Sequence, residues 1–158
     1  ILDTEEESML RIVGGAVRNH LLGVPVTDID FATIWTPEEV MKKCQSFGVH
    51  AVPTGIDYGT VTIVIEEQTF EVTTLRKDVE TDGRRAVVSY SRSWEEDAKR
   101  RDFTMNALYM DKHGEIFDPL GEGRNDLNER VVRFIGTPEN RIKEDALWIL
   151  RFYRFSLY

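Results

Sequence analysis

The sequence contains a single cysteine, Cys44, among its 158 residues. One thiol cannot form an internal disulfide, and a zinc site built from cysteines would need more of them. No apolar run approaches the ~20 residues of a membrane-spanning helix, and the N-terminal residues lack the pattern of a signal peptide. The P-loop pattern G-x-x-x-x-G-K-[ST] is also missing, which argues against a P-loop phosphotransferase. We therefore expect a cytoplasmic protein with no membrane partner.

Basic residues are fewer than acidic residues. The 20 lysine and arginine residues are outnumbered by 28 aspartate and glutamate residues, for a net charge of −8. Because dedicated nucleic-acid-binding domains usually present a basic surface, this balance argues against one. The length and the 41% share of hydrophobic residues suit a globular domain with a proper core. The chain begins at Ile1 rather than at methionine and stops within an expected helix at Tyr158, so we expect it to be part of a longer protein.

The most informative stretch is a predicted strand–turn–helix–strand unit at residues 11–33. Its turn carries Gly14 and Gly15, which lack Cβ atoms and so let a phosphate group approach the N-terminus of the following helix. Its second strand carries Asp28 and Asp30. Side chains two positions apart on a strand point to the same face, so we expect these carboxylates to lie side by side.

Two carboxylates on the face of a strand at residues 28–32 repel each other unless a cation lies between them. Mg²⁺ prefers hard oxygen ligands and often keeps substrate phosphates in its shell. The alternative is a solvated edge strand that follows a plain glycine turn. Because both features occur in one unit, we favour a magnesium site beside a phosphate-binding turn.

The pattern GG-x-VR-x-x-LLG-x-x-x-x-DID resembles the first signature of the class II nucleotidyltransferases. This family comprises the bacterial-type CCA-adding tRNA nucleotidyltransferases and the bacterial poly(A) polymerases, and similar motifs continue along nearly the whole chain. The resemblance implies that Asp28 and Asp30 hold Mg²⁺ and that Gly14, Gly15 and Arg18 hold a triphosphate. In such two-metal transfer, one ion lowers the pKa of the RNA 3′-hydroxyl and the other neutralises the leaving pyrophosphate.

Two segments with strong alternation, residues 59–65 and 69–75, predict a β-hairpin. If its second strand pairs beside residues 28–32, Glu71 approaches the two aspartates as a third acid. Otherwise Glu71 is an exposed strand residue. The family's E-x-T-x-x-R segment follows the metal-binding strand in the sheet, so the resemblance favours a supporting catalytic role for Glu71.

A helix is predicted to begin at the N-cap Thr36. Its apolar face is expected to carry Val40, Met41, Cys44 and Phe47. We expect Cys44 to be packed rather than reactive, because no basic neighbour is evident that would lower its pKa.

Residues 77–93 lack a clear periodicity and are rich in charged residues, serine and glycine, so we expect a mobile loop. In CCA-adding relatives a flexible loop at this place helps to switch specificity from C to A. Another helix is predicted to start after Ser93, with Glu95, Glu96 and Asp97 in its first turn, where acids interact favourably with the helix dipole.

Residues 100–107, RRDFTMNA, resemble the family's RRDFT-x-NA motif. Asp102 can accept hydrogen bonds from ribose hydroxyls, and the arginines can pair with a triphosphate. The alternative is a basic helix surface with an incidental acid. The resemblance assigns Arg101, Asp102 and Asn106 to the nucleotide site.

The segment at residues 110–119 predicts a strand, a tight turn and a second strand. It leads into a DP-x-G…DL pattern at residues 118–127, which in the family connects sheet to helices and performs no chemistry. The three histidines, His20, His50 and His113, lack partners at metal-ligand spacing, and we find no catalytic histidine.

The last signature resembles the family pattern ED-x-x-R-x-x-R, whose Asp and first Arg hydrogen-bond the base edges of CTP and ATP. Asp145 and Arg151 match it, and Arg154 follows Arg151 on the same predicted helix. Trp148 stands at the first arginine position, as either a natural variant or an introduced substitution. A tryptophan offers one N–H donor and a stacking face instead of a guanidinium fork.

The expected fold is α/β (α+β in some schemes), a small mixed sheet with flanking helices. Residues 1–136 would form a catalytic head, and residues 137–158 would start a helical neck domain that recognises the nucleobase. The implied activity is Mg²⁺-dependent addition of CMP and AMP, from CTP and ATP, to the 3′ end of tRNA. The alternatives are a poly(A) polymerase, a partial (CC- or A-adding) enzyme, or a non-catalytic nucleotide-binding domain.

Overall fold

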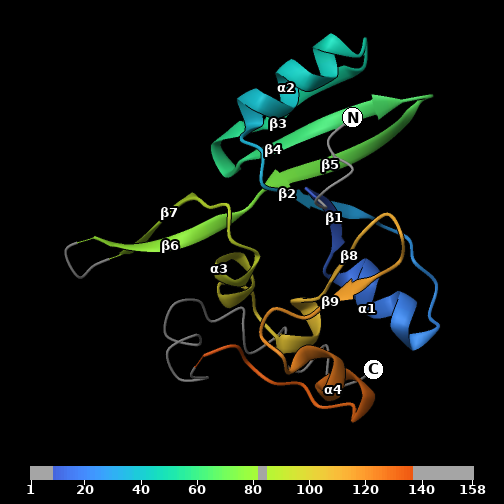
Figure 1. Ribbon diagram of the computed structural model, residues 1–158, viewed down its shortest axis with the longest axis vertical. Coiled ribbons are helices and arrows are strands. Elements are labelled where there is room, and N and C mark those ends of the chain that lie inside the picture. The colour runs from blue at the N-terminus through green and yellow to red at the C-terminus, as the bar shows by residue number, and fades with distance from the viewer. Residues whose placement is uncertain (1–8, 82–84, 137–158) are drawn as a thin grey trace.

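The structure is a computed structural model that describes residues 9–81 and 85–136 (Figure 1). Its main element is a seven-stranded sheet in the order β3-β4-β5-β2-β1-β8-β9. The β2–β5 pair is parallel and the other pairs are antiparallel, so the predicted mixed sheet is confirmed. The strands of this sheet are β1 (Leu10–Val13), β2 (Asp30–Thr33), β3 (His50–Gly55), β4 (Thr60–Ile65), β5 (Gln68–Thr74), β8 (Tyr109–Met110) and β9 (Ile116–Phe117).

The predicted flanking helices are also present. They are α1 (Gly15–Leu22), α2 (Pro37–Ser46), α3 (Trp94–Lys99) and α4 (Gly123–Asn128), with short 3-10 turns at Ile56–Tyr58 and Thr104–Asn106. No helix in the described part of the chain is long and apolar enough to cross a membrane.

Alternation along the central strands gives the sheet one apolar face and one face that carries carboxylates. Phe31 of β2 is the register partner of Val72 of β5, and both pack in a core cluster with Cys44 of α2. Asp30 and Glu71, one position earlier on each strand, are also register partners. Because successive strand residues point to opposite faces, these two carboxylates lie on the side of the sheet away from α2.

The predicted start of α2 is confirmed in detail. The Thr36 hydroxyl accepts a hydrogen bond from the Glu39 amide at 3.3 Å, and the Glu39 carboxylate accepts one from the Thr36 amide at 2.9 Å. The buried face includes Val40 and Cys44 as expected. Phe47 is 64% exposed, so its placement on that face was wrong. It follows the last helical residue, where the chain already turns away from the helix.

The β4–β5 hairpin is confirmed, with Glu66 and Glu67 between its strands. Both turn residues have positive φ values, 50° and 66°, in the left-handed region that glycine and asparagine favour.

The expected loop at residues 77–93 is wrong as a secondary-structure assignment for the described residues up to Tyr90. Strands β6 (Arg76–Thr81) and β7 (Arg85–Tyr90) pair as an antiparallel ribbon that projects from the body of the molecule (Figure 1). Lys77 and Asp78 at the base of this ribbon are exposed, so they follow no hydrophobic alternation. Backbone pairing forms the ribbon, and a reading of side-chain periodicity misses it.

The predicted helix after Ser93 is present and short, spanning Trp94–Lys99. The Ser93 hydroxyl caps it by accepting a hydrogen bond from the Glu96 amide at 3.3 Å, and α3 ends at Lys99. The RRDFT-x-NA segment therefore lies after the helix, and the alternative of a basic helix surface was wrong. The strand–turn–strand prediction for residues 110–119 is confirmed by β8 and β9.

The predicted neck segment at residues 137–158 lies outside the described residues, and with it Asp145, Trp148, Arg151 and Arg154. Residues 1–8 also lie outside them. From the sequence alone, residues 1–10 are expected to form a helix that leads into the first strand, but Leu10 begins β1.

Candidate active site

An open cavity of about 520 Å³ gathers residues that are distant in the sequence. Its wall is formed by the end of β1, the start of α1, β2, β5, the start of β6 and the segment after α3. Eight of the predicted site residues line it: Gly14, Gly15, Arg18, Asp30, Glu71, Arg101, Asp102 and Asn106.

Asp30 and Glu71 form the acidic part of this wall. They are register partners across the parallel β2–β5 pair, and both are exposed toward solvent. The expectation that the second hairpin strand pairs beside the DID segment is therefore confirmed. Within the described residues, no group of three or more His, Cys, Asp and Glu side chains is arranged to hold a metal ion.

Asp28 does not share this position. The strand was predicted to start at Asp28, but β2 begins at Asp30, and Asp28 lies in the exposed irregular segment before it. The reason is that β1 ends at Val13, the partner of Asp30, because the chain turns at Gly14. Residues before Asp30 thus have no β1 partner, and strand alternation does not place Asp28 beside Asp30.

The backbone conformation of the turn before α1 explains why it contains glycine. Gly14 adopts φ 72° and ψ −129°, which side chains other than glycine rarely adopt, and its amide donates to the Leu108 carbonyl oxygen at 3.2 Å. A Cβ atom on Gly15 would lie 3.3 Å from Nη2 of Arg18. The two glycines therefore allow the sharp entry into α1 and leave room for the Arg18 guanidinium.

A chain of hydrogen bonds connects Arg18 with Asp102. Nη1 of Arg18 donates to Oδ1 of Asn106 at 2.7 Å, and Nδ2 of Asn106 donates to Oδ1 of Asp102 at 3.1 Å. The Phe103 amide donates to the same Asp102 oxygen at 2.7 Å. Asn106 is buried and uses its side-chain amide for these contacts, so it orients the arginine and the aspartate on either side of it.

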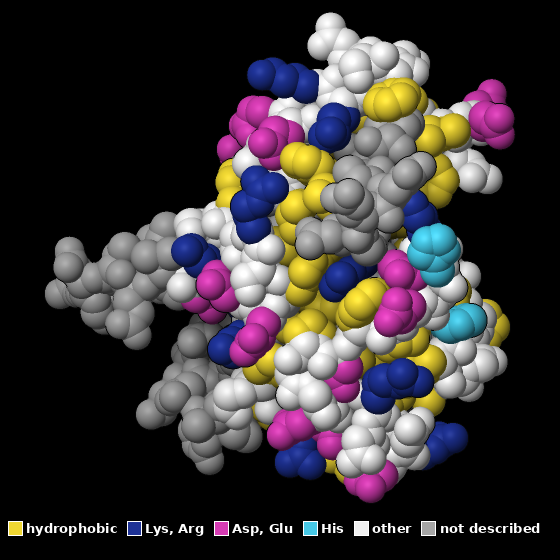
Figure 2. Space-filling model, viewed as in Figure 1, with side chains coloured by type: hydrophobic (Ala, Val, Ile, Leu, Met, Phe, Trp, Pro, Cys, Tyr) yellow, Lys and Arg dark blue, Asp and Glu magenta, His cyan; other side chains and the backbone are white. Residues whose placement is uncertain are grey.

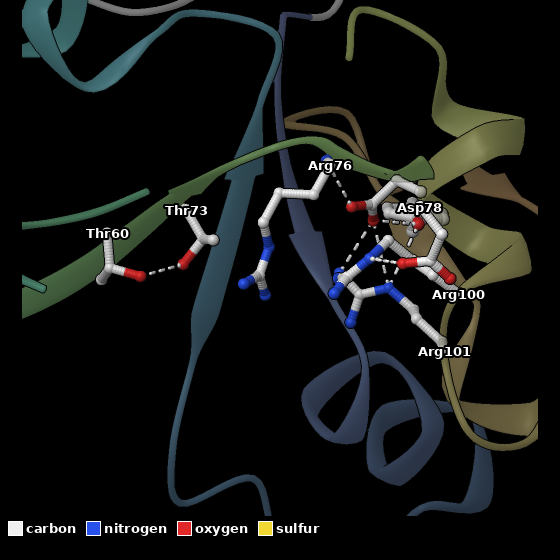
Figure 3. A network of polar contacts seen from close by, with 8 residues as sticks. Thr60, Thr73, Arg76, Asp78, Arg100 and Arg101 are labelled. Carbon is white, nitrogen blue, oxygen red and sulfur yellow. Dashed lines mark hydrogen bonds and ion pairs between the residues drawn. The ribbon is translucent and has the colours of Figure 1, made fainter. Parts of the chain in front are cut away.

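Arg101 is held by a buried network that the sequence did not reveal (Figure 3). Asp97 accepts hydrogen bonds from Nη2 of Arg101 at 3.0 Å, from the Tyr109 hydroxyl at 2.7 Å and from the Arg76 amide at 3.0 Å. Asp97 had been assigned only to the helix dipole. Its spacing of four residues from Arg101 was a usable signal, whereas the contact with Tyr109 had none.

The network keeps Arg101 charged and Tyr109 neutral. Burial lowers the pKa of Arg101, but the neighbouring Tyr109 and Asp97 outweigh it and leave that pKa above its ordinary value. Burial is the main reason that the pKa of Tyr109 is raised. Arg101 therefore presents a permanent positive charge to the cavity.

Two further arginines, Arg76 and Arg100, line the cavity although the sequence analysis did not assign them to the site. Arg76 ends the E-x-T-x-x-R pattern and Arg100 begins the RRD pattern, so their positions in these two motifs were a usable signal.

The predicted connecting role of the DP-x-G…DL segment fits its contacts. Asp118 accepts hydrogen bonds from the Gly123 and Arg124 amides at the start of α4. Asp126 is buried and accepts from the Thr104 hydroxyl at 2.7 Å and from Nε of Arg133 at 2.9 Å. These carboxylates support the fold.

Residues 10–133 match the sequence profile of the poly A polymerase head domain. The chain belongs to this family. It is 48% identical over 147 residues to the mitochondrial CCA tRNA nucleotidyltransferase 1 of Danio rerio, covering 92% of this chain and 34% of that protein. It is 46% identical over 145 residues to the CCA-adding enzyme of Geobacillus thermodenitrificans, covering 90% of this chain and 35% of that protein.

Two solved structures resemble this chain in fold over most of its length. The Bacillus stearothermophilus CCA-adding enzyme in complex with CTP matches with a TM-score of 0.78 and 44% identity, over 92% of this chain and 34% of that one. A tRNA nucleotidyltransferase with a primer tRNA and an incoming ATP analog matches with a TM-score of 0.70 and 31% identity, over 94% of this chain and 41% of that one. The chain spans about a third of the length of the relatives it matches.

Proposed function

We propose that this chain is the catalytic head of a tRNA nucleotidyltransferase that adds CMP and AMP, from CTP and ATP, to the 3′ end of tRNA. The observation that carries the proposal is the cavity itself, which combines a glycine turn, two carboxylates in register and four arginines. The names of the relatives, CCA-adding enzyme and CCA tRNA nucleotidyltransferase, support the same reaction.

In this proposal the triphosphate lies against the glycine turn and the arginines. Gly14 and Gly15 let its oxygens approach the start of α1, and Arg18 and Arg101 pair with its negative charge. Asp102, oriented by Asn106, accepts hydrogen bonds from the ribose hydroxyls. An aspartate in that role selects ribonucleotides over deoxyribonucleotides.

The donor set fits a magnesium ion in part. Asp30 and Glu71 offer the cavity carboxylate oxygens, the ligands that Mg²⁺ prefers. We propose that Asp28 and Asp30 hold the metal and that Glu71 supports them. Bound there, Mg²⁺ would lower the pKa of the primer 3′-hydroxyl and neutralise charge on the pyrophosphate.

The bond changes define what the protein groups must do. The primer 3′-hydroxyl releases its proton to solvent and its oxygen forms a bond to the α-phosphorus. The bond from that phosphorus to the bridging oxygen of the β-phosphate breaks, and its electron pair leaves on pyrophosphate. Arg18 and Arg101 stabilise the departing negative charge. Both guanidiniums are held in place beforehand, Arg18 by Asn106 and Arg101 by Asp97, so little reorganisation is needed during the reaction.

Recognition of the base and of the tRNA is proposed for other parts of the protein. We propose that Asp145, Trp148, Arg151 and Arg154 face the nucleobase. On the face shown in Figure 2, basic and acidic side chains are interspersed and no broad basic patch is visible. With a net charge of −8, this head is expected to leave most tRNA contacts to further segments.

A cytoplasmic location stays a prediction, because some relatives are named mitochondrial.

The test is the product formed on a tRNA that ends before CCA, incubated with CTP, ATP and Mg²⁺. The proteins are this chain and a chimera in which residues 10–133 replace the matching segment of the Geobacillus stearothermophilus CCA-adding enzyme. We expect the chimera to add C, C and A and then stop. Long A-tails would favour the second candidate, a poly(A) polymerase, which the name of the matching family supports. No incorporation would leave a nucleotide-binding domain without catalysis.

A further inference from the structure

Three arginine side chains meet at one wall of the cavity (Figure 3). Arg76 is the first residue of β6, and Arg100 and Arg101 follow α3 directly. Like charges this close repel one another, and burial adds to the cost of each charge. A fold keeps such a cluster when anions are available to balance it.

Two of the three arginines have a carboxylate partner within the protein. Arg101 forms an ion pair with Asp97 at 3.0 Å, and Asp97 is almost fully buried. Arg100 lies 3.5 Å from the Asp78 carboxylate, measured from its Nε atom. Each of these two guanidiniums therefore has one carboxylate partner within the protein.

Arg76 differs from its neighbours. Its backbone amide donates to Asp97, but its buried Nε has no hydrogen-bond partner, and no ion pair joins its guanidinium to a carboxylate among the described residues. In Figure 3 this guanidinium ends between Thr73 and the Arg100–Arg101 pair, without a dashed line to any neighbour. Burial, and then the charge of Arg100, lower the pKa of Arg76, and the charge of the nearby Asp97 offsets this only in part.

We propose that Arg76 is a further phosphate-binding residue of this site, whose guanidinium, unlike those of Arg100 and Arg101, has no carboxylate partner among the described residues. A guanidinium fork matches two phosphate oxygens, and its five donors suit an anion that enters the open cavity. The phosphate comes either from the nucleoside triphosphate or from the 3′ end of the RNA. The inference rests on the proposed function for this choice of ligands.

The experiment measures binding of tripolyphosphate, which carries neither base nor ribose, to the 158-residue chain by isothermal titration calorimetry. We expect Arg76→Gln to weaken binding roughly tenfold or more, because a charge-assisted hydrogen bond is lost. Arg76→Lys keeps the positive charge but loses the planar guanidinium. Its affinity for tripolyphosphate should therefore lie between those of the unmodified chain and Arg76→Gln. Arg92→Gln is the matched control, since Arg92 is exposed and lies outside the cavity lining.

A second titration with tRNA that ends before CCA separates the two phosphate sources. Weaker tripolyphosphate binding assigns Arg76 to the nucleotide. Unchanged tripolyphosphate binding with weaker tRNA binding assigns it to the RNA 3′ end. Unchanged binding of both, or an unmodified chain that binds neither, overturns the inference.

Stability without ligand separates a binding role from a structural one. Removing an unpaired cation beside two others relieves repulsion, so Arg76→Gln should leave the urea midpoint of the ligand-free chain unchanged or raise it. A lower midpoint would mean that Arg76 supports the fold, and would contradict the inference. If Arg76→Gln loses tripolyphosphate binding while the chimera transfers no nucleotide, the proposed function fails and the phosphate assignment stands.

Discussion

At the scale of single residues, Asp97 organises one wall of the cavity. It is 2% exposed and accepts hydrogen bonds from Arg101, Tyr109 and the Arg76 backbone. Because it holds both a charged side chain and the start of β6, its loss should affect stability and nucleotide binding together.

Asp97→Asn should lower the free energy of unfolding by about 3 kcal/mol, because it leaves the Arg101 charge without its buried partner. It should also raise the KM for CTP of the chimera more than it lowers kcat, since Arg101 loses its orientation. Urea unfolding and steady-state kinetics measure the two effects. Glu95→Gln, which removes the exposed partner of Lys99, is the control and should change neither. Equal effects of both substitutions would contradict the role of Asp97.

Gly14→Ala tests the turn before α1. Gly14 and Gly114 both have positive φ values, 72° and 81°, and a Cβ atom on either would meet no atom closer than 3.9 Å. Substitution by alanine should therefore destabilise the chain by roughly 1 kcal/mol at each site. Only Gly14→Ala should also weaken CTP binding, because its methyl group would occupy the surface where phosphate approaches. Equal CTP affinities for the two variants would count against the phosphate-binding turn.

Trp148→Arg tests the base-recognition proposal. The substitution restores the guanidinium fork of the family pattern, so the chimera extended to carry residues 10–158 should discriminate more sharply against UTP and GTP. Competition between labelled CTP and unlabelled UTP measures this ratio. Unchanged discrimination against UTP and GTP would contradict the proposed role of position 148.

The sequence predicted which residues gather in the cavity where a short motif contains them. Gly14, Asp30 and Asp102 each sit in a short motif with a stated reason for its residue types, and the structure brings all three to one cavity. The partnership of Asp97 with Tyr109 joins residues whose spacing carries no periodic signal, so no local pattern could show it. The placement of Asp28 on the strand was wrong for a local reason, because strand alternation holds only where a neighbouring strand continues.

At the scale of elements, the Asp126–Arg133 pair ties α4 to the segment that follows it. Asp126 belongs to α4, and its carboxylate also accepts a hydrogen bond from Thr104 in the neighbouring 3-10 turn. Burial raises the pKa of Asp126, but the hydrogen bonds from Arg133 and Thr104 outweigh it, so the pKa is lowered overall.

This lowered pKa makes a prediction about pH. A carboxyl group whose pKa is lower in the folded state stabilises the fold above its unfolded pKa of about 4, and the benefit is lost as pH falls through the folded value. Urea midpoints of the unmodified chain should therefore drop below pH 4 more steeply than those of Asp126→Asn. Parallel pH profiles of the two proteins would contradict the prediction.

Element boundaries were predictable where side chains define them. The capping box of α2 and the alternation of β4 and β5 depend on residues close together in the sequence, and both predictions are confirmed. The β6–β7 ribbon was missed because it projects from the body, and Lys77 and Asp78 at its base face solvent. Hydrophobic periodicity reports contact with a core, so it is weak where a ribbon stands apart from one.

At the scale of the whole molecule, the sheet order explains why the cavity forms. The strand order places β2 between β1 and β5, so the turn after β1 and the carboxylates of β2 and β5 meet at one place. The segment after α3 then brings Arg101, Asp102 and Asn106 to the same cavity. The head spans about a third of the length of its relatives, so a test of transfer is best made inside a full-length partner.

The most direct measurement is the single-turnover rate of CMP incorporation by the chimera with and without Asp30→Asn. The head segment of the host has been replaced, so the residues that line the cavity in the chimera come from this chain. We predict that Asp30→Asn lowers the rate by on the order of a thousandfold, the equivalent of several kcal/mol of metal-assisted stabilisation. Metal-free CTP binding should be unchanged. Asp57→Asn, an exposed acid outside the cavity, should keep the full rate. A rate for Asp30→Asn close to that of the unmodified chimera would contradict the assignment of this cavity as the site of nucleotide transfer.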